Sequence, residues 1–103
     1  MTAQSSGAQG ASPGAIVRVL EITNKKGLHA RASAKFVQTV ERFDATVMVT
    51  RAGETVGGNS IMGLMMLSAA PGTSITVEAS GREAAAAMEA IHALIADRFG
   101  EED

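Results

Sequence analysis

The order of strand-like and helix-like segments constrains the fold of this chain more than any other feature of its sequence. Four runs rich in β-branched residues are typical of strands, and three segments with helical periodicity are interspersed with them. The expected strands cover residues 16–22, 45–50, 55–56 and 73–79, and the expected helices cover residues 30–42, 60–67 and 81–99. This β-α-β-β-α-β-α order predicts an α/β (α+β) two-layer open-faced sandwich, with helices on one face of a sheet and water on the other.

Two of these segments carry the clearest local signals. Residues 73–79 alternate strictly, which places Ile75, Val77 and Ala79 on the inward face of a strand. The last helix is expected to start at a capping box, with Ser80 at the N-cap and Glu83 three positions later. The glycine at position 100 is expected to end that helix.

The chain of 103 residues is expected to form one domain with two tails. Residues 1–15 carry no charged side chain and no large apolar residue after Met1, so they cannot offset the entropy of ordering. They are therefore predicted to form a disordered N-terminal tail. The folded domain is expected at residues 16–99, and residues 100–103 are interpreted as an acidic C-terminal tail.

The composition excludes several classes of function. A net charge of −2 and an aromatic fraction of 3%, without Trp or Tyr, provide neither the charge nor the stacking surfaces for nucleic-acid binding. The absence of cysteine excludes disulfides and thiolate metal sites and fits a cytoplasmic location. No apolar run approaches the ~18 residues of a membrane-spanning helix, and the N-terminus lacks the form of a secretion signal, so no membrane insertion is expected.

The chemistry of the chain is expected in residues 24–35, where the first strand is followed by the first helix. A neutral imidazole such as that of His29 is a good nucleophile toward phosphorus, and its phosphoramidate is labile, which suits a transient carrier. The backbone N–H groups of Ala30 and Arg31 at the start of the helix would point at a phosphoryl group, and the Arg31 guanidinium would add a cation. The glycine at position 27 gives the loop freedom to place the ring at the surface.

The residue types alone leave a less specific interpretation open. A single histidine near an arginine is most often an ordinary surface residue, and anion sites at helix N-termini are common. No second histidine and no carboxylate lies near His29 in the sequence, so no metal site is expected. The other histidine, His92, falls inside the last helix and is interpreted as structural or solvated.

Two motifs make the assignment more specific. Residues 26–31, Lys-Gly-Leu-His-Ala-Arg, resemble the active-site signature of HPr, the histidine-containing phosphocarrier of the phosphoenolpyruvate-dependent phosphotransferase system. Residues 59–64, Asn-Ser-Ile-Met-Gly-Leu, resemble the regulatory-serine helix of the same family, and Ser60 lies at the family's spacing from His29. The resemblance covers residues 16–99 and implies a four-stranded antiparallel sheet of order 1-4-2-3 under three helices.

The resemblance also implies a function and its partners. His29 would accept a phosphoryl group on Nδ1 from phosphorylated enzyme I and pass it to a histidine of an enzyme IIA protein or domain, in sugar uptake or in a regulatory branch. Arg31 would stabilise the phosphorylated state, and HPr kinase/phosphorylase would modify Ser60. Such a protein is a carrier that is itself modified rather than an enzyme, and it is expected to be a monomer without a cofactor.

One position departs from the family pattern. The family usually has proline directly after the arginine, whereas this chain has Ala32. Alanine is also a good residue in a first helical turn, and its N–H would be an additional donor to phosphate. We therefore expect the chemistry to be retained, with a looser loop. Ser33 places a further hydroxyl close to the site.

The apolar residues that follow Ser60 suggest a surface for docking partners. Leu64 and Leu67 are expected to face the sheet, which would leave flexible methionines outside, and such side chains suit a surface that meets several partners. The alternative is that the whole segment belongs to the core. The residues expected to form this docking surface are Leu28, Lys35, Ile61, Met62 and Met65.

Two other functions remain open from the sequence. The chain could be a non-transferring, HPr-like regulatory protein that acts through Ser60, although the presence of His29 counts against this. It could also be a small-ligand-binding α/β domain, although no pocket chemistry is evident in the sequence.

Overall fold

The computed structural model describes residues 14–101, so most of the expected N-terminal tail and the last two residues of the expected acidic tail lie outside the described residues. Each expected strand and helix is present, with ends that differ by at most three residues. Within residues 14–101, the helices are all too short or too polar to cross a bilayer. The elements are β1 (Ile16–Glu21), α2 (Ala30–Val40), β2 (Thr46–Arg51), β3 (Glu54–Gly57), α3 (Ile61–Met66), β4 (Ser74–Ser80), α4 (Ala84–Ala96) and the short 3-10 helix η1 (Arg98–Gly100).

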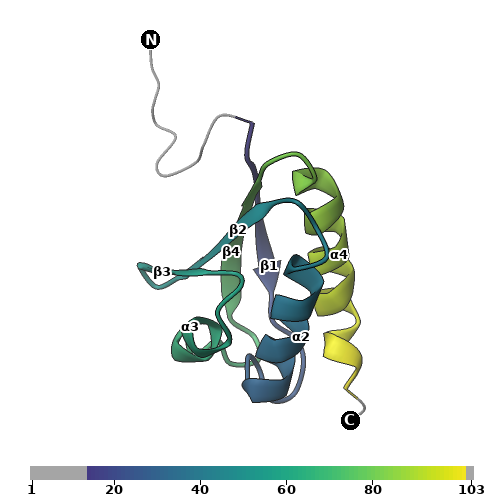
Figure 1. Cartoon of the computed structure of the whole chain (residues 1–103). Helices are drawn as coiled ribbons and strands as arrows, with labels where there is room; N and C mark the ends of the chain where they lie inside the picture. The colour runs from purple at the N-terminus through teal and green to yellow at the C-terminus, as the bar shows by residue number, and fades with distance from the viewer. Residues whose placement is uncertain (1–13, 102–103) are drawn as a thin grey trace.

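The strands form one four-stranded antiparallel sheet of order β1-β4-β2-β3, which confirms the predicted topology. β4 lies in the interior of the sheet and pairs with β1 on one side and β2 on the other. Because α4 runs back after β4, its C-terminal end reaches the same end of the sheet as the loop between β1 and α2 (Figure 1). Residues from both ends of the domain are thereby brought together.

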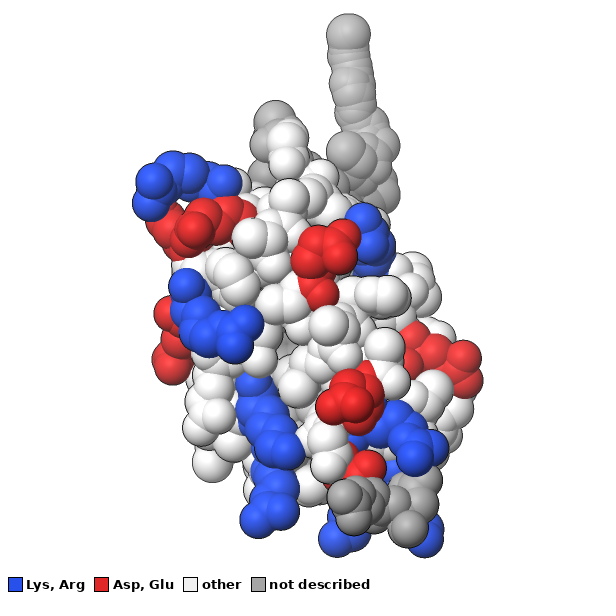
Figure 2. Space-filling model, turned by 90° about the vertical axis from the view of Figure 1, so that its right-hand side faces the viewer, with Lys and Arg blue, Asp and Glu red and all other residues white. Residues whose placement is uncertain are grey.

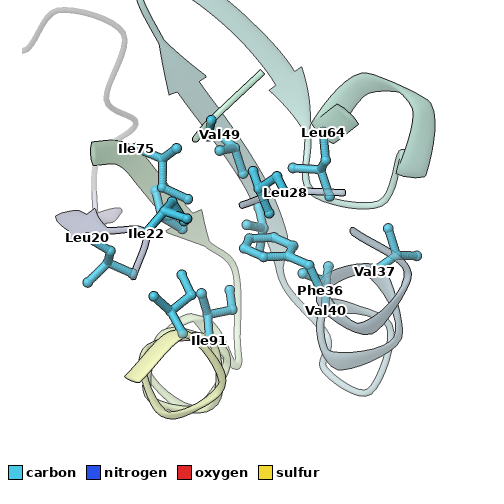
Figure 3. Close-up of a cluster of buried hydrophobic side chains, with 14 of the residues drawn as sticks. Leu20, Ile22, Leu28, Phe36, Val37, Val40, Val49, Leu64, Ile75 and Ile91 are labelled. Carbon is cyan, nitrogen blue, oxygen red and sulfur yellow. The ribbon is translucent and has the colours of Figure 1, made fainter. Parts of the chain in front are cut away.

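The core lies between the sheet and the helices. Ile75, Val77 and Ala79 of β4 are buried, as the alternation predicted. Figure 3 shows Phe36 of α2 and Ile91 of α4 pointing toward this face of the sheet from neighbouring helices. With aromatics scarce, aliphatic side chains and methionine fill most of the core. The opposite face of the sheet is open, so even apolar side chains such as Val17 and Val19 of β1 are exposed.

The prediction of a capping box at Ser80 is wrong. Ser80 is the last residue of β4, and its pairing with Thr46 keeps it extended. The chain then turns at Gly81, which has φ = 105°, and Glu83 takes the N-cap position without making a capping hydrogen bond. The Glu83 carboxylate instead accepts a hydrogen bond from the backbone N–H of Asp44, 2.6 Å away. Strand pairing therefore overrides the local helix-start signal.

The loop before α2 is tied to the segment after α3 through a close backbone contact. Leu28 donates its backbone N–H to the carbonyl of Ala69 at 3.0 Å. Gly27, at φ = 63°, lies so close to the same carbonyl that a Cβ at this position would be 2.2 Å from the oxygen. Only glycine fits here, because the position requires both a left-handed backbone and the absence of a side chain.

This contact predicts that Gly27→Ala is strongly destabilising. Gly53→Ala is a matched control, because Gly53 has φ = 83° but a Cβ added there would meet no atom within 4 Å. In urea unfolding, we expect Gly53→Ala to lower the free energy of unfolding by about 1 kcal/mol, the cost of a left-handed alanine. Gly27→Ala adds the clash and should cost about 3 kcal/mol in total. Equal losses for the two variants would contradict this account.

Candidate functional site

His29 occupies the N-cap position of α2, as the sequence analysis expected of a residue at the helix entry. Its backbone N–H donates to the carbonyl of Gly27 at 2.9 Å, and its own carbonyl accepts the first helical hydrogen bond, from Ser33, at 2.9 Å. Its side chain makes no capping hydrogen bond, so the imidazole is available to contacts outside the helix. The side chain is 25% exposed, which leaves part of the ring accessible to a partner.

The surroundings of His29 have the features of an anion-binding site. The backbone N–H groups of Ala30, Arg31 and Ala32 belong to the first helical turn and have no acceptor within the helix. Arg31 is exposed and lines an open pocket with His29. Lys25 and Lys26 line the same pocket. Figure 2 shows Lys and Arg side chains at the end of the molecule where this loop lies. The helix N-terminus and these cations together favour negative charge.

The two residues after Arg31 help to hold the loop. The side chain of Ala32, at the position where the family usually has proline, is completely buried. Ser33 is also buried, and its hydroxyl donates to the carbonyl of Leu28 at 3.2 Å. The hydroxyl of Ser33 therefore has a structural partner in the loop just before His29.

The structure adds a residue that the sequence analysis missed. Oε2 of Glu101 lies 2.5 Å from Nε2 of His29 and also accepts a hydrogen bond from Nδ2 of Asn24 at 2.9 Å. Glu101 falls in the predicted acidic tail, outside the predicted domain at 16–99, yet its side chain contacts His29. The only sequence signal was the predicted topology. Because the first strand and the last helix both run antiparallel to the last strand, both must finish at the same end of the sheet.

These contacts keep Glu101 ionised. The hydrogen bond from His29 is the largest cause holding the pKa of the Glu101 carboxyl below its ordinary value, and the donors Asn24 and the Lys26 backbone N–H act in the same direction. Burial opposes them, because it raises the pKa. Within residues 14–101, no cluster of three or more potential ligands could hold a metal ion. Because it is ionised, the Glu101 carboxylate beside His29 is an anionic hydrogen-bond acceptor.

Ser60 is the N-cap of α3, and its Oγ accepts a hydrogen bond from the backbone N–H of Gly63 at 2.9 Å. Leu64 and Leu67 are buried, as expected, and α3 packs against α2 and β3. Ser60 is half-buried and lies at the start of the helix, where additional negative charge is tolerated.

The exposed face of α3 agrees in part with the expected docking surface. Ile61, Met62 and Met65 are exposed, and Met66, which the sequence analysis does not include, joins them along one open apolar groove. Met62 is the most accessible of the four, at 73%.

The prediction that Leu28 extends this surface is wrong. Leu28 is buried, and its side chain lies among Val49, Leu64 and Phe36 in Figure 3. The hydrogen bond from its N–H to Ala69 turns the side chain into the core. Lys35 is half-buried, and its Nζ donates to the carbonyl of Phe99 at 2.6 Å, so it supports the end of the chain.

Comparison with known proteins gives a consistent result. Residues 16–97 match the family described as the PTS HPr component phosphorylation site. The phosphocarrier protein HPr of Neisseria meningitidis is 55% identical over 82 residues, covering 80% of this chain and 92% of that protein. HPr of Cupriavidus necator is 51% identical over 80 residues, covering 78% and 90%. The crystal structure of HPr-C-His from Thermoanaerobacter tengcongensis has a TM-score of 0.81 and 39% identity, covering 85% of this chain and 99% of that one.

The lowered pKa of Glu101 predicts a pH-dependent contribution to stability. A carboxyl whose pKa is lower in the folded state stabilises the fold above its unfolded value, near 4.5, and this contribution is lost as the pH falls through the folded value. We expect the difference in unfolding free energy between wild type and Glu101→Gln to shrink as the pH falls below about 4. Urea unfolding across this range measures it. A difference that is independent of pH would contradict the prediction.

Proposed function

The chain belongs to the HPr family of phosphocarriers of the phosphotransferase system, and we propose that His29 is its phosphoryl acceptor. In this proposal, Nδ1 of His29 takes the phosphoryl group from phosphorylated enzyme I and passes it to a histidine of an enzyme IIA protein or domain. The observation that carries the proposal is the position of His29, partly exposed at the N-terminus of α2, beside the Arg31 cation. The protein is regenerated by passing the group on, so it acts as a carrier.

The site supplies what transfer to Nδ1 requires. The Nδ1 lone pair attacks phosphorus, a P–N bond forms, and the bond between phosphorus and the donor breaks. The phosphoryl oxygens then carry negative charge next to the first turn of α2. The free N–H groups of Ala30 and Arg31, and the Arg31 guanidinium, stabilise that charge by hydrogen bonds and by the helix dipole. The N–H of Ala32, which proline would lack, is available in the same turn.

The exposed groove of α3 is the proposed docking surface for these partners. It consists of Ile61, Met62, Met65 and Met66 and lies on a helix that packs against α2, the helix that carries the site. Unbranched methionine side chains can adapt to partners of different shape. Lys25, Lys26 and Arg31 next to His29 form a basic rim that would attract acidic partner surfaces.

Ser60 is the proposed regulatory site, modified by an HPr kinase/phosphorylase. Its hydroxyl caps α3 at the edge of the docking surface, so a phosphate there would add about −1.5 to −2 charges beside the apolar groove. The helix N-terminus tolerates this charge, so the fold is retained. The added charge would repel an acidic partner and slow transfer to His29.

Phosphorylation by enzyme I tests the proposed acceptor. Wild type incubated with enzyme I and labelled phosphoenolpyruvate should take up label that is labile in acid and stable in alkali, as a phosphoramidate is. His29→Ala should abolish the label. His92→Ala is the matched control, because His92 is exposed on α4 and removing it should leave the label intact. Retention of label by His29→Ala would disprove the assignment, and absence of label from wild type would favour a non-transferring regulatory protein.

A pair of substitutions at Ser60 tests the regulatory role. Ser60→Asp and Ser60→Asn place nearly identical side chains at the N-cap, and both can cap the helix, but only aspartate adds a charge. We expect Ser60→Asp to raise the KM of enzyme I for the carrier by about threefold to tenfold, the effect of one charge near an interface. Ser60→Asn should stay close to wild type. Equal KM values for Asp and Asn would show that charge at this position does not regulate docking.

A further inference from the structure

Beyond the acceptor itself, we propose that Glu101 is a positioning residue, which holds the His29 ring with its proton on Nε2 and directs Nδ1 toward the incoming phosphoryl group. The statement that Nδ1 attacks the phosphoryl group rests on the proposed function. The contact between the two side chains is a separate claim about this chain, and it can be tested without any partner protein.

The contact and the negative charge of the carboxylate together determine the tautomer. An ionised carboxylate only accepts hydrogen bonds, so Nε2 of His29 must donate across the 2.5 Å that separates it from Oε2 of Glu101. A neutral imidazole that carries its proton on Nε2 has its lone pair on Nδ1. The nitrogen that must attack phosphorus is thus the one left unprotonated, and the hydrogen bond also restricts rotation of the ring.

The carboxylate is itself held from a second side. Asn24 is completely buried, and its Nδ2 donates both to Oε2 of Glu101 at 2.9 Å and to the carbonyl of Gly27 at 2.8 Å. The same Gly27 carbonyl accepts the backbone N–H of His29. One buried amide therefore connects the loop that carries His29 to the carboxylate that orients its ring. Glu101 is only 16% exposed, so water competes weakly for these contacts.

The chain reaches this position through an unusual reversal after α4. Arg98 and Phe99 have φ values of 53° and 56°, and Gly100 has 73°, so three consecutive residues are left-handed. For the two that are not glycine, this conformation is unfavourable and persists only where the surroundings impose it. Phe99 is buried in the core, and its carbonyl accepts a hydrogen bond from Nζ of Lys35. Residues held in such unfavourable backbone conformations are common at functional sites, and here they precede the residue that contacts His29.

The contact also suits the phosphorylated state. When Nδ1 bonds to phosphorus, the proton on Nε2 stays and the ring gains positive charge. The Glu101 carboxylate then accepts a hydrogen bond from a cationic donor, which is stronger than one from a neutral donor. The carboxylate faces Nε2, the nitrogen that does not bind phosphorus. Glu101 lines the same pocket as Lys25, Lys26 and Arg31, and its contact with the ring is made through Nε2 rather than through Nδ1.

The test measures the ring directly. Nitrogen-15 chemical shifts of His29, recorded at a pH where the ring is neutral, distinguish the two tautomers in wild type, Glu101→Ala and Glu101→Gln. Wild type should have its proton almost entirely on Nε2. Both variants should show an increased Nδ1–H population. Alanine removes the acceptor of the Nε2 proton, and the amide of glutamine can donate to Nε2 instead. Glu89→Gln, which removes a carboxylate from the exposed face of α4, is the matched control and should leave the ring unchanged.

Transfer kinetics provide the second measurement. The rate of phosphoryl transfer from enzyme I should fall about tenfold in Glu101→Ala and Glu101→Gln, the effect of one hydrogen bond to a charged group. Backbone amide spectra verify that each variant is folded. Unchanged tautomers and rates in both folded variants would overturn the proposal, as would a wild-type ring protonated on Nδ1. Failure of wild type to accept label would refute the proposed function. The nitrogen-15 spectra would still show whether Glu101 keeps the His29 proton on Nε2.

Discussion

The position of β4 between β1 and β2 is the constraint on which the rest of the structure depends. Pairing with β1 places the first and last strands of the domain side by side, and the return of α4 brings Glu101 to the β1–α2 loop. This arrangement assembles the site from residues far apart in the sequence, Asn24 and His29 from the loop and Glu101 from the other end. Strand order and the direction of α4 together thus decide which end of the sheet holds the residues that can meet His29.

Two kinds of contact then hold the site at the surface of this core. Leu28 is buried and donates its N–H to Ala69, which anchors the loop directly before His29 and connects it to the segment after α3. The buried amide of Asn24 anchors the other side. His29 is thereby presented from an anchored loop, and one pocket beside it is lined by Lys25, Lys26, the start of α2 and Glu101, whose carboxylate contacts the ring. The exposed methionines of α3 lie outside this network of contacts.

Much of this architecture could be predicted from the sequence, because periodicity and turn residues report local structure. The order of elements, the inward face of β4 and the two faces of α3 were all predicted correctly. The failures have a common cause. Ser80 has the local signal of a helix cap, but strand pairing holds it in β4. Leu28 stands next to His29 in sequence, yet backbone contacts turn it into the core. At Ser80 a non-local interaction outweighed a valid local preference, and at Leu28 a non-local contact decided an orientation that neighbouring residues do not report.

The sequence by itself determined the family, the fold and the identity of the residue proposed to carry the phosphoryl group, because these depend on motifs and on local patterns of polarity. Only the tertiary structure decided what surrounds that residue. No spacing rule relates His29 to Glu101, 72 positions apart, since their contact results from strand order, the direction of α4 and three left-handed residues after it. A residue that the sequence assigns to an acidic C-terminal tail therefore supplies the carboxylate that faces the His29 ring.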